Sequence, residues 1–211
     1  GLNQFRIFLF LIFFVSSMMN NNINRYNYYH YCKKNQYVNN NVDFDFSFKT
    51  MLLKKIYTLV FLRNDSQILL GWKKRGFGVN KWNGFGGKVE LNETIIEAAA
   101  RELKEECCIT VKTADLRNIG CLEFTFEGEP TMMDVRVFTT KDFEGMPQET
   151  EEMSPKWFDI NCIPFNDMWP DDKFWFPYML NSKLFYAKFH YKGFDTILHY
   201  NIKELIYLLH K

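Results

Sequence analysis

The pattern of apolar and polar residues first predicts β-strands. Ile56–Leu62 and Gln67–Lys73 are rich in β-branched and other apolar residues, and the turn-forming segment Arg63–Ser66 separates them. Two such runs around a short polar turn predict a β-hairpin. Further strands are predicted at Ile119–Phe126, Met132–Thr140, Trp157–Ile160, Phe185–Tyr191 and Thr196–Ile202, the last two as a hairpin around Gly193.

Helical spacing interrupts these strands twice. Within Glu93–Cys107, apolar residues recur three and four positions apart, which predicts an amphipathic helix. Asn92 is its predicted N-cap, and the acidic Glu93 suits the first turn. A second helix is predicted over Pro170–Leu180, because proline followed by aspartate suits a helix start. Many strands and few helices predict an α+β domain with a mixed sheet.

Residues 1–50 have a different character. Ile7–Val15 is apolar but shorter than the ~20 residues that a membrane-spanning helix needs. Its length suits the apolar part of a signal peptide, yet no small-residue cleavage site follows. Asn20–Asn41 is crowded with Asn and Tyr, which is typical of low-complexity, disordered segments. We expect an N-terminal extension over residues 1–50 and one folded domain over residues 51–211, with Met51 as a candidate start.

The amino-acid composition limits the classes of partner that the chain is expected to bind. The 211 residues are 47% hydrophobic with a formal net charge of +1, so the chain can build a core but has no basic field to collect nucleic acid. Five cysteines without metal-ligand spacing argue against a disulfide scaffold and favour a reducing compartment. We expect a monomer in the cytoplasm, with mitochondria and the nucleus as alternatives. We expect no stable nucleic-acid partner, and no membrane contact by the folded domain.

The helix predicted over Glu93–Cys107 carries the candidate chemistry. Glu102, Glu105 and Glu106 lie at i, i+3 and i+4, which places three carboxylates on one helix face. Like charges at these spacings repel one another unless cations neutralise them. Mg²⁺ does so when it is held by a few carboxylates and by phosphate oxygens. Taken alone, such a cluster is more often a solvated acidic face.

A longer sequence pattern around these glutamates favours a metal site over a solvated acidic face. The chain reads Gly87, five residues, Glu93, seven residues and then Arg-Glu-Leu-Lys-Glu-Glu-Cys-Cys-Ile over residues 101–109. This resembles the Nudix box, G-x5-E-x7-R-E-U-x-E-E-x-G-U, where U is a bulky aliphatic residue. The resemblance implies a Nudix fold, in which a mixed β-sheet is packed between helices as an α/β/α sandwich. It also implies a hydrolase that uses Mg²⁺ or Mn²⁺.

The same resemblance implies roles for individual residues. It implies metal contacts by Glu102, Glu105, Glu106, Gly87 and Glu152. The implied catalytic residues are Glu105, Glu106 and Arg101, although Arg101 is better explained as a partner of Glu93 that braces the loop against the helix. Which glutamate is the base and how many metals bind stay open, and Glu152 suits a surface acidic loop equally well. Cys108 stands where the family has a glycine that adopts a left-handed conformation, so we expect slight destabilisation or a modified helix end rather than lost catalysis.

Residues outside the box resemble a narrower group, the animal oxidised purine nucleoside triphosphatases. The resemblance runs from about Lys55 to about Leu205. It rests on Tyr57–Val60, Lys73–Gly78, Trp82–Val89, Gly128–Pro130, Met133–Val135, Ile163–Asp172, Trp175–Pro177 and Asp195–Leu198. It implies a substrate pocket made by Thr58, Lys73, Phe77, Asn83, Phe124, Phe126, Met133, Trp169, Asp171 and Asp172.

Two adjacent carboxylates give this pocket its expected selectivity. Asp171 and Asp172 cannot both ionise easily in a partly dry site, so one tends to keep its proton. A protonated aspartate donates and an ionised one accepts, which would let one pocket bind an oxidised guanine or an oxidised adenine. Individually, these residues have plainer explanations. The acidic pair could stabilise a helix N-terminus, the aromatic residues could be ordinary core, and Asn83 could hold a loop.

The sequence therefore predicts hydrolysis of oxidised purine nucleoside triphosphates, such as 8-oxo-dGTP and 2-hydroxy-dATP, to the monophosphate and pyrophosphate. Such an enzyme would cleanse the nucleotide pool of precursors that mispair in DNA. The alternatives are a Nudix pyrophosphatase of another specificity, for dinucleoside polyphosphates, ADP-ribose or capped RNA, and a non-catalytic Nudix binding module. The ranking of oxidised substrates stays open.

Overall fold

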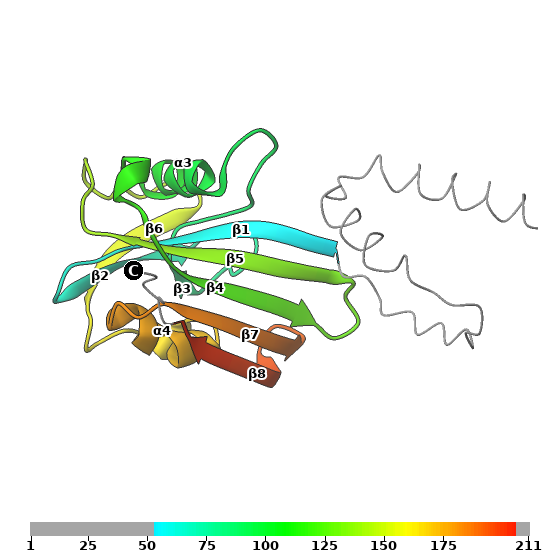
Figure 1. Ribbon diagram of the computed structural model, residues 1–211. Coiled ribbons are helices and arrows are strands. Elements are labelled where there is room, and N and C mark those ends of the chain that lie inside the picture. Colours follow the sequence, from blue (N-terminus) through cyan, green and yellow to red (C-terminus); the bar gives the residue numbers. More distant parts are fainter. Residues whose placement is uncertain (1–52, 206–211) are drawn as a thin grey trace, which may run out of the picture. The chain divides into compact units, whose positions relative to one another are not determined.

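The computed structural model describes residues 53–205, which form two β-sheets and two α-helices (Figure 1). The larger sheet has the strand order β1 (Leu53–Leu62), β5 (Thr131–Thr140), β4 (Arg117–Phe126), β7 (Phe185–Lys192) and β8 (Thr196–Glu204). The smaller sheet has the order β3 (Trp82–Asn83), β2 (Gln67–Lys73) and β6 (Met153–Asp159). The helices are α3 (Ile95–Cys107) and α4 (Asp172–Leu180), and short 3-10 turns span Thr113–Asp115 and Phe165–Asp167.

The larger sheet is mixed, because β4 pairs antiparallel with β5 and parallel with β7. All predicted strands are present, and the late hairpin is confirmed by the antiparallel β7–β8 pair, with Gly193 at φ 59° in its turn. The hairpin predicted for the first two strands is wrong, since β1 and β2 belong to different sheets. A single bridge, Arg63 to Ile68, joins them next to the turn. Apolar periodicity identifies a strand but not its partner.

Two apolar cores lie on opposite sides of β1 and β2. Phe61, Ile68 and Leu70 pack in the core that contains α4, whereas Val60 and Leu69 pack in the core that contains α3. Successive strand residues point to opposite faces, so a strand that is buried on both faces needs an unbroken apolar run. The helices on either side (Figure 1) confirm the expected sheet between helices.

Helix α3 starts later than its sequence predicts. Thr94 is the N-cap, where Asn92 was expected, and its side chain and that of Glu97 form a capping box. This reciprocal pair satisfies two backbone N–H groups that the first turn leaves free. Glu93 therefore lies before the helix. At the other end, Cys108 adopts the left-handed conformation, with φ 64°, at the position where the box has glycine. Helix α4 likewise begins at Asp172 rather than Pro170.

A glycine segment, Gly84–Gly87, lies against β1. Backbone hydrogen bonds join Val60 and Phe85 in both directions, at 2.6 and 3.0 Å, and Thr58 donates to the Gly87 carbonyl at 2.8 Å. A Cβ atom on Gly86 would lie 2.0 Å from the Thr58 carbonyl oxygen. No side chain fits in that space, so only glycine allows the two backbones to approach this closely. This segment brings the start of the box to β1.

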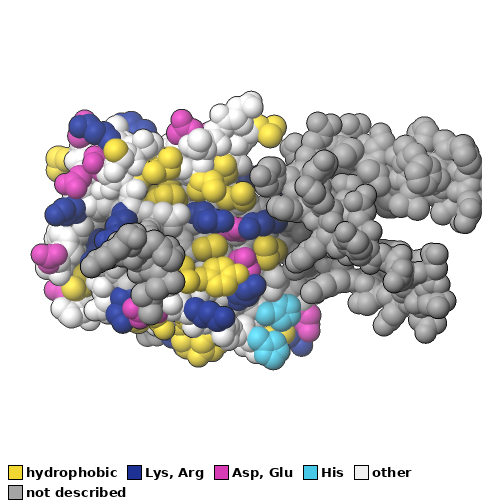
Figure 2. Space-filling view, viewed as in Figure 1, with side chains coloured by type: hydrophobic (Ala, Val, Ile, Leu, Met, Phe, Trp, Pro, Cys, Tyr) yellow, Lys and Arg dark blue, Asp and Glu magenta, His cyan; other side chains and the backbone are white. Residues whose placement is uncertain are grey.

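On the face seen in Figure 2, Lys, Arg and acidic side chains are scattered among apolar ones. Asp134 on β5 is fully buried, where it is paired with Lys54 and accepts from Arg136 at 2.6 Å. Burial alone would raise the pKa of Asp134, but these two cations lower it overall.

The four cysteines among residues 53–205 are free thiols. In the same part of the chain, no helix is both long and apolar enough to cross a membrane. The predicted extension over residues 1–50 lies outside the described residues.

We predict that Cys108→Gly stabilises the domain. A left-handed conformation costs a residue with a Cβ atom about 1 kcal/mol, and glycine adopts it without that cost. Urea unfolding should show the gain as a higher midpoint with an unchanged slope. Asn92→Gly, at φ 69°, is the matched control. Its gain should be smaller, because asparagine tolerates this conformation. A lower midpoint for Cys108→Gly would show that the thiol side chain contributes more than the backbone strain removes.

Candidate active site

The three carboxylates on α3 lie along a polar cleft. Glu102 and Glu106 are largely buried, whereas the Glu105 side chain is mostly exposed. Arg101 donates to both Glu102 and Glu105, at 2.9 and 3.0 Å, and so offsets the repulsion between them. It also holds Glu93 through two hydrogen bonds, at 3.0 and 2.7 Å, which confirms the predicted brace between loop and helix. These hydrogen bonds keep Arg101 protonated and raise its pKa.

A second cation, Lys73, lies on the other side of the cleft. Its ammonium group donates to Glu106 at 2.7 Å and to Glu152 at 3.1 Å. Burial alone would lower the pKa of Lys73, but these two carboxylates raise it overall. Burial raises the pKa of Glu106 by more than Lys73 lowers it, so the pKa is raised overall. Glu152 also pairs with Arg75 at 2.8 Å, so the structure places this predicted residue at the cleft.

The cleft suits a divalent ion, although no cage is preformed. Among the described residues, no three His, Cys, Asp or Glu side chains converge on one point. Arg101 and Lys73 instead neutralise the carboxylates in pairs. A Cβ on Gly87 would lie 2.4 Å from Glu102 Oε1, so glycine leaves open the space beside that carboxylate. The Gly87 carbonyl, a predicted metal contact, already accepts from Thr58. Oxygen donors around this space are the type that Mg²⁺ prefers.

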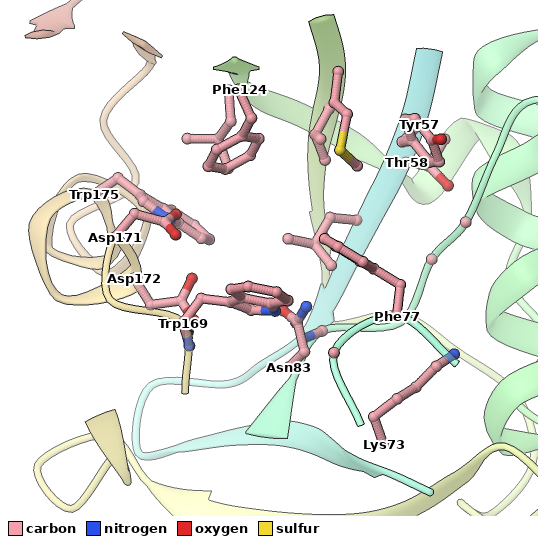
Figure 3. A pocket seen from close by; sticks show the side chains of 18 of the residues that line it. Tyr57, Thr58, Lys73, Phe77, Asn83, Phe124, Trp169, Asp171, Asp172 and Trp175 are labelled. Carbon is pink, nitrogen blue, oxygen red and sulfur yellow. Dashed lines mark hydrogen bonds between the residues drawn. The ribbon is translucent and has the colours of Figure 1, made fainter. Parts of the chain in front are cut away.

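An apolar cavity of about 140 Å³ adjoins this cleft. Figure 3 shows side chains that line the cavity. All ten residues predicted for the substrate pocket line it: Thr58, Lys73, Phe77, Asn83, Phe124, Phe126, Met133, Trp169, Asp171 and Asp172. They come from segments far apart in sequence, which is why their joint appearance carries more weight than any single residue. Lys73 lines both the cavity and the cleft and so joins the two.

The cavity combines flat apolar walls with a few polar groups. Phe77 and Trp169 stack with ring centroids 5.0 Å apart. The Asn83 carbonyl oxygen accepts from Gly84 N–H at 2.8 Å, which leaves its amino group for a ligand. Thr58 Oγ1 is buried and has no hydrogen-bond partner among the described residues. Few placed polar groups in an apolar cavity are typical of a small-molecule site.

The two aspartates lie at the floor of the cavity with different partners. Asp171 accepts from the Tyr191 hydroxyl at 2.6 Å and from Trp175 Nε1 at 2.9 Å, so each of its oxygens already accepts one hydrogen bond and can accept another. Asp172 accepts from the Trp169 backbone N–H at 3.1 Å. Burial raises the pKa of both, and the charge of Asp171 raises that of Asp172 further. Because two side-chain donors stabilise its ionised form, we expect Asp171 to ionise before Asp172, which keeps its proton to higher pH.

Sequence reasoning missed several lining residues. Tyr191 and Trp175 hold Asp171 in place, and Tyr57 and Leu59 lie beside Thr58. Trp175 stands four residues after Asp171, one helical turn away, and this spacing could have indicated the contact. Tyr191 lies on β7, and nothing in its local sequence distinguishes it from ordinary core.

The NUDIX domain model matches residues 53–179, which include the glycine segment, α3 and most of α4. The chain belongs to the NUDIX family. Curated NUDIX relatives include the "Oxidized purine nucleoside triphosphate hydrolase" of Danio rerio, 50% identical over 74% of this chain and 98% of the relative. The protein of the same name from Mus musculus is 47% identical over the same shares.

Among solved NUDIX structures, a MutT protein from Bacillus halodurans is 28% identical to this chain. It superposes with a TM-score of 0.62 over 70% of this chain and 97% of that one. The relatives are matched over nearly their full length, so the similarity extends well beyond the helix that carries the box. This agrees with the expected Nudix fold.

We predict that Asp172→Asn stabilises the NUDIX domain at neutral pH. The folded pKa of Asp172 lies above its unfolded value of about 3.9, so the group's contribution to stability is complete below about pH 4. It is lost as the pH rises through the folded pKa. Asparagine can still accept from Trp169 but carries no charge, so the gain in Tm should be absent near pH 4 and reach at least about 2 °C at pH 7.

Thermal unfolding across that pH range measures the effect. Asp142→Asn, at an exposed aspartate that does not line the cavity, is the control and should leave the pH profile unchanged. An Asp172→Asn profile parallel to wild type would show that Asp172 does not keep its proton in the folded state.

Proposed function

We propose that this NUDIX protein hydrolyses oxidised purine nucleoside triphosphates to the monophosphate and pyrophosphate. The observation that carries the proposal is the buried Asp171–Asp172 pair at the floor of an apolar cavity that opens beside the carboxylate helix. The names of the Danio rerio and Mus musculus relatives support the same activity. By this activity the protein removes mispairing precursors before they enter DNA.

Recognition of the base is assigned to the cavity. The carboxylate of Asp171 accepts, the protonated Asp172 can donate, and the Asn83 amino group offers another donor. Trp169 and Phe77 provide flat surfaces on which a purine can stack. Buried polar groups discriminate strongly between substrates, because a base that leaves one of them unpaired is rejected. If the proton moved to Asp171, the pattern would reverse and suit a base with different edge groups.

Hydrolysis is assigned to the cleft. Glu102, Glu105 and Glu106, with Glu152 at the cleft edge, would hold Mg²⁺ or Mn²⁺, which neutralises phosphate charge and lowers the pKa of a bound water. Arg101 fixes Glu102 and Glu105 in position, and Gly86 N–H fixes Glu106 at 2.8 Å. Lys73 lies between cavity and cleft, where its charge faces the phosphates of a nucleotide whose base fills the cavity. The monomeric, cytoplasmic state expected from the sequence stays a prediction.

We predict that the protein, supplied with Mg²⁺, hydrolyses 8-oxo-dGTP at least about tenfold faster than dGTP in kcat/KM. We expect a polar group of the cavity to pair with an atom that only the oxidised base carries, and one such hydrogen bond is worth about 1.4 kcal/mol or more. Steady-state release of pyrophosphate measures the ratio. Equal rates, or no cleavage of the oxidised nucleotide, would contradict the proposed specificity.

The double variant Asp171→Asn, Asp172→Asn separates this function from other NUDIX specificities. It should abolish the preference for 8-oxo-dGTP and leave hydrolysis of ADP-ribose or a dinucleoside polyphosphate at its wild-type level. A wild-type protein that prefers one of those compounds would favour the alternative pyrophosphatase.

Glu106→Gln tests catalysis itself. We expect kcat to fall at least about 100-fold, because a metal ligand contributes more than the outer-shell partners, whose loss costs 10–100-fold. Glutamine can still accept from Gly86, so the fold is retained. Calorimetric titration with Mn²⁺ should show weakened binding. Glu144→Gln, at an exposed carboxylate outside the cleft, is the control. Unchanged hydrolysis in Glu106→Gln would favour a different centre, and no hydrolysis in wild type would favour a binding module.

A further inference from the structure

Four aromatic side chains meet at the mouth of the cavity. Phe194, in the turn between β7 and β8, lies with its ring centroid 5.6 Å from Phe77, 5.8 Å from Phe126 and 6.5 Å from Trp169. Each ring meets Phe194 edge to face. The other three line the cavity, whereas Phe194 packs against them from outside. Four segments distant in sequence thus form one aromatic rim, and Phe194 is its outermost member.

Phe194 is exposed in a place where a polar residue is expected. It is 56% exposed and follows Gly193, whose φ of 59° makes the tight turn. Turns of this kind usually carry Asn, Asp, Ser or Gly. The next residue, Asp195, lies 3.6 Å from Lys81, and the Lys81 ammonium lies 5.3 Å from the centre of the Trp169 ring. Lys81 thus lies next to both the turn and Trp169.

The cavity is too small to enclose a whole nucleotide, so residues at its rim can contact the rest. Pockets that enclose small-molecule ligands usually measure about 300–1,000 Å³. The cavity here measures about 140 Å³, so it can enclose only part of a nucleotide. The triphosphate belongs with the polar cleft. The part of the nucleoside that the cavity does not enclose, which includes the sugar, would then lie at the mouth, where Phe77 and Phe194 each leave 56% of their surface exposed.

We propose that Phe194 is a substrate-contacting residue that closes the aromatic rim over the bound nucleoside and sets its affinity. The inference rests on the proposed function and adds a binding residue to it. The exposed ring gains apolar contact when the nucleoside arrives, and Phe77 and Trp169 fix its position before binding. This contact is the same in the ground state and the transition state, so it affects substrate binding rather than the chemical step.

Phe194→Ala tests the inference in the full-length protein. Loss of a base–aromatic contact should raise KM for 8-oxo-dGTP, and Kd for 8-oxo-dGMP, about fivefold or more. The value of kcat should change by less than about twofold. Steady-state kinetics give KM and kcat, and titration of tryptophan fluorescence gives Kd. Phe194→Tyr, which keeps the ring, should restore wild-type KM and Kd.

Leu198→Ala is the matched control, because Leu198 is a partly exposed apolar residue of the same hairpin that does not line the cavity. It should leave KM and Kd unchanged. If Phe194→Ala lowers Tm but keeps wild-type KM and Kd, the ring only supports the hairpin and the inference is overturned. If wild type neither binds nor hydrolyses the oxidised nucleotides, the proposed function fails and the inference fails with it.

Discussion

The close contact between β1 and the glycine segment Gly84–Gly87 determines how the rest of the site is arranged. It is a backbone contact in which a single added Cβ would collide with a carbonyl oxygen. One side of it presents Thr58 to the cavity, and the other places Gly86 and Gly87 against the carboxylates of α3. The cavity and the cleft are therefore held at a fixed separation by two paired backbones, which deform far less than side chains.

Charge is balanced in pairs across the cleft. Three glutamates on one helix face would destabilise the helix if they stood alone. Arg101 binds two of them, and Lys73 binds the third together with Glu152. Both cations are themselves fixed, Arg101 by Glu93 and Lys73 by its place on β2. The domain can therefore fold with its acidic cluster in place and without a bound cation.

Much of this could be predicted from the sequence, for physical reasons. The Nudix box is a local pattern on one helix, so its spacing gives both the helix face and the partner of Arg101. The pocket residues are scattered, and only resemblance to relatives could group them. The partner of β1 was predicted wrongly, because alternation of apolar residues contains no information on which strand lies alongside. The N-cap was missed because Asn92 and Thr94 both suit that position, and the capping box with Glu97 decided between them. Phe194 was missed because the local sequence of a turn does not show that the fold places this phenylalanine near the cavity.

Thr58 carries a consequence for inhibitor design. Its buried hydroxyl has no hydrogen-bond partner among the described residues, and an unpaired buried hydroxyl costs about 1–3 kcal/mol. A compound that places one hydrogen-bonding atom at that point pairs the hydroxyl without breaking a hydrogen bond within the protein. A compound that covers the hydroxyl with a methyl group leaves it unpaired. This single atom should therefore separate tight binders of similar shape from weak ones.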